Sequence, residues 1–306
     1  MRTAFVTGGT GMIGLALIDF LAAENIQTTV LVRPGSPRAH LLANRDWIRV
    51  VEGDLNGDLS SLPLPSSSHE AFIHLGWNTA SREAVEDPDS QTKEITQTLN
   101  AVALASALGA KVFVGAGSQA EYGRVEGLLA PNTPTRPESA YGHAKLAACA
   151  LSRIKCDRLS IRHCWCRILS VYGPWDKPTT GIMYCIDTLL RGLSPALTPC
   201  RQQWDFLYSE DCARALWLTA LAGRPGATYA VGSGSAPPLR WYFETLRDLI
   251  DPALALNFGG KPYGERQVMH LQADSSDLFQ DTGFRPQVDF QEGITRTVDW
   301  RRSHPD

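Results

Sequence analysis

A tyrosine and a lysine lie four positions apart in the segment Tyr141-Gly142-His143-Ala144-Lys145. The segment opens a helical pattern, so the phenol and the ammonium would share one face of a helix. A free phenol titrates at about pH 10, and a neighbouring ammonium favours the phenolate, which suits proton transfer at neutral pH. Tyr141 and Lys145 are therefore candidate catalytic residues, whereas His143 would point away from their face and is expected to be structural.

A serine follows a short apolar run that ends in Gly115-Ala116-Gly117. Parallel sheets bind ligands at the carboxyl ends of their strands, so Ser118 is placed for chemistry. We expect its hydroxyl to hydrogen-bond the same substrate oxygen as Tyr141. Lys145 would orient the tyrosine and also hold the ribose of a nicotinamide cofactor.

A glycine-rich turn follows the first predicted strand directly and opens a helix. In a dinucleotide site, Gly8 would permit a tight turn, Gly11 would let the backbone approach a pyrophosphate, and Gly14 would let the helix pack closely on the strand. Free N–H groups at the helix N-terminus would bind the anion. The predicted cofactor contacts in this turn are Thr7, Gly8, Thr10, Gly11, Met12, Ile13 and Gly14.

The second predicted strand ends at Val32 and is followed by Arg33 rather than by an acid, with Arg38 close behind. A carboxylate there would accept hydrogen bonds from the adenosine ribose of NAD, whereas a guanidinium suits the 2′-phosphate of NADP. NADP is therefore the predicted cofactor, with NAD as the alternative. The remaining predicted cofactor contacts are Asp54, Leu55, Leu75, Gly76 and Tyr172.

Short β-branched runs alternate with helix-length segments through the first half of the chain. Strands are predicted at residues 3–6, 28–32, 48–51, 71–75, 111–114 and 159–162, and helices at 12–23, about 91–108 and 140–154. This alternation predicts an α/β fold with a Rossmann-like, doubly wound parallel sheet.

Glycine and proline break the later part of the chain into shorter pieces. Residues 1–170 are predicted to form an NADP-binding domain with returning segments around 201–232, and residues 171–306 mainly a smaller α/β substrate-binding lobe.

The composition excludes several classes of partner. The chain has 306 residues, 43% of them hydrophobic, and a formal net charge of −3, so it presents no basic field for nucleic acid or anionic lipid. Neither a signal peptide nor a membrane-spanning stretch is recognisable, which predicts a cytoplasmic protein. The seven cysteines are odd in number and unpaired in spacing, which predicts reduced thiols. No metal site is predicted, although Cys164 and Cys166 would share one face of a strand.

These motifs, in this order, resemble the extended short-chain dehydrogenases, also called the NAD-dependent epimerase/dehydratase family. The resemblance covers nearly the whole chain, and it also rests on Ser118 before Tyr122-Gly123, on 167–174, on 204–208 with Asp211, and on 283–300. It implies a nucleotide-diphosphate sugar as substrate. It also implies a homodimer through the helices near 91–108 and 140–154.

The two residues after Ser118 narrow the reaction that this resemblance implies. Dehydratases of the family carry Asp-Glu there, because eliminating water needs an extra acid and base. At the second of these positions, decarboxylases of the family carry a glutamate. The epimerase-reductases that make fucose nucleotides carry a cysteine there. Here the residues are Gln119 and Ala120, which leaves chemistry that needs only a hydride and one proton.

The pattern is closest to nucleotide-sugar 4-ketoreductases. In that interpretation NADPH reduces a 4-keto-6-deoxyhexose, Tyr141 donates the proton and Ser118 stabilises the alkoxide. A 4-epimerase with tightly bound NAD is the alternative, and a non-catalytic dinucleotide sensor is a third possibility.

The predicted substrate contacts are Trp77, Ser118, Gln119, Ser170, Trp204 and Arg266. Two of them depart from the family. Many relatives have an arginine in place of Trp204, where it contacts the diphosphate, and an asparagine in place of Ser170, near the sugar. Arg266 or Arg201 could supply the missing phosphate contact, and Trp204 could stack on a base or pack between the lobes.

Overall fold

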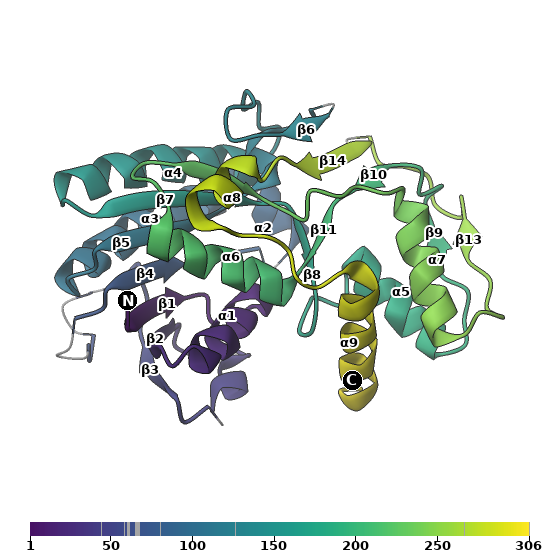
Figure 1. The fold of residues 1–306 in the computed structure, drawn as a ribbon, viewed down its shortest axis with the longest axis horizontal. Coiled ribbons are helices and arrows are strands. Elements are labelled where there is room, and N and C mark those ends of the chain that lie inside the picture. The colour runs from purple at the N-terminus through teal and green to yellow at the C-terminus, as the bar shows by residue number, and fades with distance from the viewer. Residues whose placement is uncertain are drawn as a thin grey trace.

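A seven-stranded parallel sheet, in the order β12-β7-β5-β4-β1-β2-β3, forms the centre of the computed structural model (Figure 1). The structure describes residues 1–43, 45–57, 59, 62–64, 68–79, 81–125, 127–265 and 267–305. The strands of this sheet are β1 (Thr3–Thr7), β2 (Gln27–Val32), β3 (Ile48–Glu52), β4 (Ala71–His74), β5 (Val112–Ser118), β7 (Arg162–Ile168) and β12 (Thr228–Val231). The predicted Rossmann-like α/β fold is confirmed.

Helices cover both faces of the sheet (Figure 1). They are α1 (Met12–Ala23) and α6 (Ser209–Ala222) on one face, and α3 (Pro88–Ala107) and α4 (Ala140–Arg158) on the other. Side chains alternate along each strand, so Val6 packs with Leu17 and Leu216 on the first face, whereas Phe5 packs with Leu104 on the second. This double burial explains why the strands read as nearly continuous apolar runs.

A row of aromatic rings crosses the sheet beneath α3 and α4. Phe5, Phe72, Phe113 and His163 are directly opposite one another in neighbouring strands. Their successive ring centroids lie 5.1, 5.6 and 6.0 Å apart, and Trp165 continues the row at 6.0 Å from His163. These stacked pairs fix the register of the central strands.

The sixth predicted strand, residues 159–162, is misplaced. Leu159 ends α4 and is 40% exposed, and β7 begins at Arg162 and continues to Ile168. The prediction was wrong because β7 carries His163 and Arg167 among its buried residues, side chains that obscure an apolar strand pattern.

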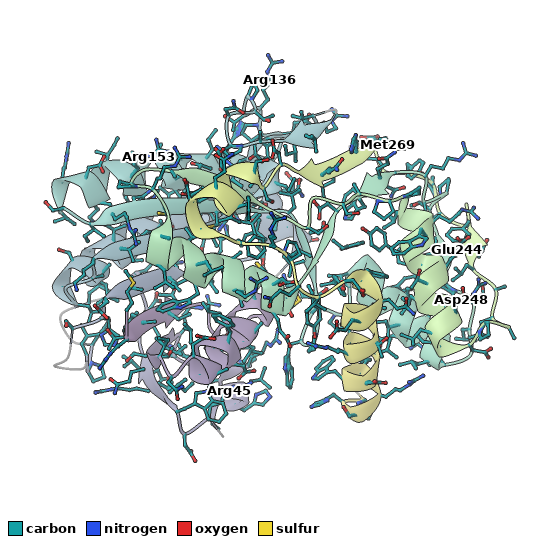
Figure 2. All side chains as sticks on the ribbon, viewed as in Figure 1. Arg45, Arg136, Arg153, Glu244, Asp248 and Met269 are labelled. Carbon is teal, nitrogen blue, oxygen red and sulfur yellow. The ribbon has the colours of Figure 1, made fainter. Side chains whose placement is uncertain are left out.

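The chain after β7 builds a smaller lobe beside the sheet (Figure 1). Its helices are α5 (Gly181–Leu190), α7 (Leu239–Ile250) and α9 (Phe290–Ser303), and its strands are β9 (Ala196–Leu197) and β13 (Asn257–Phe258). Apolar side chains of the three helices, among them Ile186, Phe243 and Ile294, form one cluster. Glu244 and Asp248 lie on the outer side of α7, as the amphipathic pattern requires (Figure 2).

The remaining elements of the described residues are short. They are β8 (Ser170–Tyr172) paired with β11 (Phe206–Tyr208), the sheet of β10 (Gln203–Trp204), β14 (His270–Ala273) and β6 (Leu128–Leu129), and the helices η1 (Ala39–Leu42), α2 (Arg82–Glu86), η3 (Gln119–Glu121) and α8 (Ser276–Thr282). None of the helices in the described part of the chain has the length and apolar character needed to cross a membrane.

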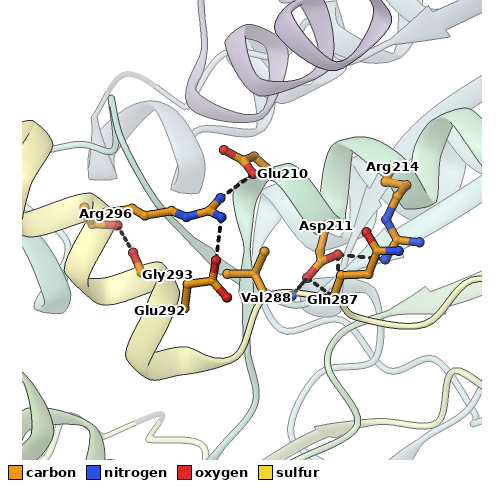
Figure 3. A network of polar contacts seen from close by, with 9 residues as sticks. Glu210, Asp211, Arg214, Gln287, Val288, Glu292, Gly293 and Arg296 are labelled. Carbon is orange, nitrogen blue, oxygen red and sulfur yellow. Dashed lines mark hydrogen bonds and ion pairs between the residues drawn. The ribbon is translucent and has the colours of Figure 1, made fainter. Parts of the chain in front are cut away.

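Two buried aspartates tie these segments together. Asp205 accepts hydrogen bonds from the backbone N–H groups of Ser233, Gly234 and Ala273 at 2.7, 2.9 and 3.0 Å. Asp211, in the first turn of α6, accepts from the N–H groups of Gln287 and Val288, just before α9 (Figure 3). In the same view, Arg296 of α9 bridges Glu210 and Glu292. These contacts fix where the lobe lies against the sheet.

Candidate functional site

A cleft of about 510 Å³ lies at the carboxyl ends of the central strands. It brings together segments that are far apart in the sequence, as expected for the edge where a doubly wound sheet binds its ligand. The predicted site residues that line it are Thr7, Gly8, Thr10, Gly11, Met12, Ile13, Gly14, Arg33, Arg38, Leu55, Leu75, Gly76, Trp77, Ser118, Tyr141 and Lys145.

The glycine turn leaves room for an anion. Gly8 has a φ of +73°, and a Cβ atom there would lie 2.6 Å from the backbone nitrogen of Gly76. A Cβ atom on Gly14 would lie 2.3 Å from the carbonyl oxygen of Gly8, whereas one on Gly11 would meet nothing closer than 3.5 Å. Among the described residues, no side chain caps the N-terminus of α1. This cradle therefore fits a dinucleotide pyrophosphate.

Three cationic side chains line the cleft beside the glycine turn, on the side where the adenosine ribose of a dinucleotide would lie. Arg33 and Arg38 follow β2, and Lys177 comes from residues 173–178, which we call the strap. The Arg38 guanidinium donates to the carbonyl of Trp175 at 3.0 Å, and the Lys177 ammonium donates to the Thr79 hydroxyl at 3.1 Å. Burial lowers the pKa of Arg38, and Asp176 opposes this effect.

The strap was not predicted as part of the site. Trp175 has a φ of +69°, unusual for a bulky residue, and its ring packs against the cluster that contains Ile18 and Val30. The strap thus spans from the lobe to the sheet. The pair Trp175 and Lys177 directly after Gly173-Pro174 is the one sequence signal that could have found it.

The three candidate catalytic residues come together at the opposite end of the cleft. Ser118 ends β5, and Tyr141 lies in the first turn of α4, which Ser139 caps by accepting from the N–H of Gly142 at 3.1 Å. The Ser118 hydroxyl lies near the Tyr141 hydroxyl and lowers the pKa of that phenol in part. The Lys145 ammonium donates to the carbonyl of Ala116 at 2.6 Å.

The electrostatics of this group differ from the prediction. Burial raises the pKa of Tyr141 to about 12, although the Ser118 hydroxyl lowers it in part. Burial lowers the pKa of Lys145 to about 7, although Glu121 and Glu94 raise it in part. The expected lowering of the phenol pKa by the ammonium is wrong here, because the Lys145 ammonium is itself desolvated and lies 5.8 Å from the centre of the Tyr141 ring.

Glu121 is a site residue that sequence reasoning missed. It is fully buried, and one carboxylate oxygen accepts from the Ser118 N–H and the Trp165 indole N–H, each at 2.9 Å. The other oxygen pairs with the Arg167 guanidinium at 2.7 Å. The spacing of Ser118 and Glu121 forms a capping box, which could have been recognised. Glu121 therefore fixes the backbone of Ser118 and is sealed from the cleft.

Two polar residues of α3, Glu94 and Gln97, also line the cleft. Glu94 is 3% exposed, and its carboxylate accepts from the Asn78 N–H at 3.0 Å and from the Gln97 amide at 2.8 Å. Burial raises its pKa, and the Asn78 hydrogen bond opposes this. Nothing in the sequence distinguished Glu94 from other acids on an amphipathic helix.

Several predicted residues do not line the cleft. Asp54 is exposed and accepts from the N–H of Asn56 in a local turn. Tyr172 is 1% exposed and packs in the aromatic cluster of the lobe. Its hydroxyl donates to the carbonyl of Phe290 at 3.4 Å. Gln119 lies in η3 beside the cleft, and Arg266 lies outside the described residues.

The two residues that depart from the family contact each other. The Trp204 indole N–H donates to the Ser170 hydroxyl at 2.8 Å, and both side chains lie away from the cleft lining. The Trp204 ring packs with the apolar cluster that contains Leu169 and Leu271. In the structure Trp204 therefore packs between the segments that join sheet and lobe.

The seven cysteines are free and buried. Cys164 and Cys166 do share one face of β7, where their thiols donate to the Arg224 carbonyl and the Thr219 hydroxyl. Over the described ranges, no group of three or more His, Cys, Asp or Glu side chains is arranged to hold a metal ion.

Comparison with known proteins gives the same family as the sequence motifs. A model of the NAD dependent epimerase/dehydratase family matches residues 4–232. The dTDP-glucose 4,6-dehydratase of an Actinoplanes species is 28% identical over 318 residues, which cover 98% of this chain and 97% of that protein.

Two solved structures share the fold over nearly the full length of both chains. The UDP-N-acetylglucosamine 4-epimerase of Methanobrevibacter ruminantium, in complex with UDP-N-acetylmuramic acid, has a TM-score of 0.88 at 22% identity and covers 99% of each chain. RMD from Pseudomonas aeruginosa, complexed with NADPH, has a TM-score of 0.79 at 24% identity, and the match covers 98% of this chain and 99% of that one.

Proposed function

The chain belongs to the NAD-dependent epimerase/dehydratase family, and we propose that it is a nucleotide-sugar 4-epimerase. The observation that carries this proposal is the convergence of Ser118, Tyr141 and Lys145 in a cleft that the glycine turn also lines. A bound nicotinamide dinucleotide would accept a hydride from carbon 4 of the sugar and return it to the opposite face. Tyr141 would take and return the hydroxyl proton, and Ser118 would hold the oxygen.

The residues after Ser118 argue against a dehydratase. Elimination of water needs a further acid and base, and the positions that would supply them are Gln119 and Ala120. Glu121 is the next carboxylate, but it is fully buried and paired with Arg167. The similarity to curated dehydratases therefore supports the substrate class, a nucleotide-diphosphate sugar, rather than the reaction.

A 4-ketoreductase is the second candidate, and two observations favour it. The raised pKa of Tyr141 keeps the phenol protonated at neutral pH, which suits a proton donor. Arg33 and Arg38 follow β2 where an acid would select NAD. These arginines, with Lys177 of the strap, also support NADP as the cofactor for either reaction.

One experiment separates the two reactions. Purified protein is denatured, and released nicotinamide is identified by chromatography. Native protein is then incubated with UDP-glucose, UDP-N-acetylglucosamine or dTDP-glucose without added reductant. Formation of the 4-epimer supports the epimerase. Oxidation of added NADPH only with a 4-keto-6-deoxy nucleotide sugar would replace it with the reductase, and accumulation of a 4-keto-6-deoxy product would contradict both.

The predicted homodimer remains a proposal. Leu151 and Ile154 of α4 are 43% and 50% exposed, and pairing of two α3 and α4 surfaces would bury them. Sedimentation of the wild type and of an Ile154→Glu variant tests this pairing, with a monomeric wild type as the contradicting result.

A further inference from the structure

The indole of Trp77 lies against the two side chains that the proposed chemistry needs. The Lys145 nitrogen sits 3.6 Å from the centre of the indole, and the Tyr141 ring meets the same indole edge-on at 6.1 Å between centroids. We propose that Trp77 is a positioning residue, which holds the Lys145 ammonium charged and in place beside Tyr141 through its π face. This inference rests on the proposed function, and it replaces the predicted role of Trp77 as a substrate contact.

The orientation of the indole is itself fixed. Its N–H donates to the side-chain oxygen of Gln91 at 2.9 Å, and Gln91 is 1% exposed. The amide nitrogen of Gln91 donates to the Ala84 carbonyl at 2.7 Å and to the Asn78 carbonyl at 3.3 Å. The indole also packs with the buried cluster of Ala148, Cys149 and Trp165. Trp77 is therefore held on two sides and presents one ring face to Lys145.

Among the residues that the structure describes, the surroundings of Lys145 offer its ammonium few other stabilising contacts besides the Trp77 ring face. Lys145 is 4% exposed, and the carbonyl of Ala116 accepts one hydrogen bond from its ammonium. The charged or titratable groups that act on it from neighbouring elements are Glu94 on α3, Glu121 on η3, His74 on β4 and Tyr141 on α4. His74 is neutral at physiological pH, and the two carboxylates are tied to other donors.

A cation over the face of an indole is stabilised most strongly when water is excluded, as it is here. Loss of this face would leave Lys145 with less compensation for its burial. Its pKa would fall from about 7 to below neutrality, so the charged fraction at pH 7.5, a minority in the wild type, would shrink by about eight-fold for each unit of the fall. An uncharged amine would bind a cofactor ribose and orient the phenol less well than an ammonium.

The test compares Trp77→Leu with Trp77→Phe, which keeps a π face. Lysine side chains labelled with carbon-13 are titrated by NMR in protein without added ligand, and the six lysines of the chain give few signals. A Lys145→Met variant identifies the Lys145 signal. We expect Trp77→Leu to lower the pKa of Lys145 by about one unit and Trp77→Phe to shift it much less.

Kinetics give the second measurement. We expect Trp77→Leu to lower kcat about ten-fold at pH 7.5, with a smaller loss at pH 6 and little change in KM for the nucleotide sugar. Trp241→Leu, a change at an exposed indole on α7, is the matched control and should leave both values unchanged. Circular dichroism establishes that each variant is folded. Gln91→Met provides a milder change if Trp77→Leu does not fold, and it should shift the Lys145 pKa in the same direction.

Two outcomes would overturn the inference. One is an unchanged Lys145 pKa in folded Trp77→Leu, and the other is a raised KM with unchanged kcat, which would restore Trp77 as a substrate contact. The NMR titration does not depend on turnover. If the wild type converts no nucleotide sugar, the proposed function fails, and the titration alone still decides whether Trp77 holds the charge of Lys145.

Discussion

At the scale of single residues, the Tyr141 hydroxyl is the group that both candidate reactions need. Its partner Ser118 and the neighbouring Lys145 are both held by backbone contacts, so removal of the phenol oxygen should leave the site intact. We expect Tyr141→Phe to lower kcat by about 100- to 10,000-fold. Thermal stabilisation by NADP should remain as in the wild type. A variant that keeps more than a tenth of the wild-type kcat would remove Tyr141 from the proton transfer.

The Glu121–Arg167 pair is the residue-scale contact on which the serine backbone depends. Glu121→Gln would leave the buried Arg167 guanidinium without a counter-ion, so we expect the free energy of unfolding to fall by about 3–5 kcal/mol. Glu138→Gln is the control, because its ion pair with Arg124 is solvent-exposed and should be worth less than about 1 kcal/mol. Urea denaturation measures both values, and equal losses would show that burial does not set the strength of the pair.

The residues that the sequence predicted well are those whose roles depend on near neighbours. Gly8 and Gly14 act within one turn, and Tyr141 and Lys145 lie one helical turn apart, so spacing alone brings each pair together. The contact between Trp77 and Lys145 joins the segment after β4 to α4, residues that are far apart in the chain. No local pattern encodes such a contact, so the sequence predicted Trp77 only as a substrate contact.

At the scale of elements, the strap connects the lobe to the end of the cleft where the adenosine should bind. Two of its polar contacts reach the segments that follow β2 and β4, namely the Trp175 carbonyl with Arg38 and the Lys177 ammonium with Thr79. We expect Lys177→Met to speed NADP dissociation about five-fold, because one charge-assisted contact is lost. Stopped-flow fluorescence measures this rate. Lys93→Met, at an exposed position on α3, is the control and should change nothing.

Element boundaries followed the strength of the local pattern. The helix predicted at 12–23 matches α1, because apolar spacing and a glycine at its N-terminus mark both ends. The strand predicted at 159–162 instead begins at Arg162, because its buried face carries polar residues that find partners only in the folded chain. Tyr172 was predicted to contact the cofactor, and its observed position depends on a long-range strand pairing. Its strand β8 pairs with β11 and turns the ring into the lobe, a pairing that the sequence does not reveal.

At the scale of the whole molecule, the order of strands in the sheet assembles the site. β1, β4 and β5 are neighbours, so their carboxyl ends bring Thr7, Gly76 and Ser118 to one edge. That convergence follows from the βαβ pattern and could be predicted. The placement of the lobe could not, because it depends on Asp205 and Asp211 accepting backbone N–H groups from segments late in the chain.

Two buried histidines make the stability of the whole molecule depend on pH. Burial lowers the pKa of His74 and of His163 to about 3, so both stay neutral in the folded protein. His74 bonds the hydroxyls of Thr7 and Thr98, and His163 bonds that of Ser152 at 2.9 Å. In the unfolded chain each imidazole takes up a proton at about pH 6.5. The unfolded state therefore binds more protons between about pH 6.5 and 3, and folding stability falls as the pH drops through that window.

We expect each of these histidines to cost about 2 kcal/mol of folding free energy between pH 7 and pH 5. Urea denaturation of the wild type at the two pH values measures the total change in the free energy of unfolding, which includes both histidines and all other titrating groups. His163→Gln removes one of the two titrations, so its stability should fall less between pH 7 and pH 5, by about 2 kcal/mol. His143→Gln is the matched control, since His143 is exposed on α4 and its loss should leave the wild-type slope unchanged. Parallel slopes for all three proteins would mean that His163 is not held neutral, and that the aromatic row across the sheet accepts a charge.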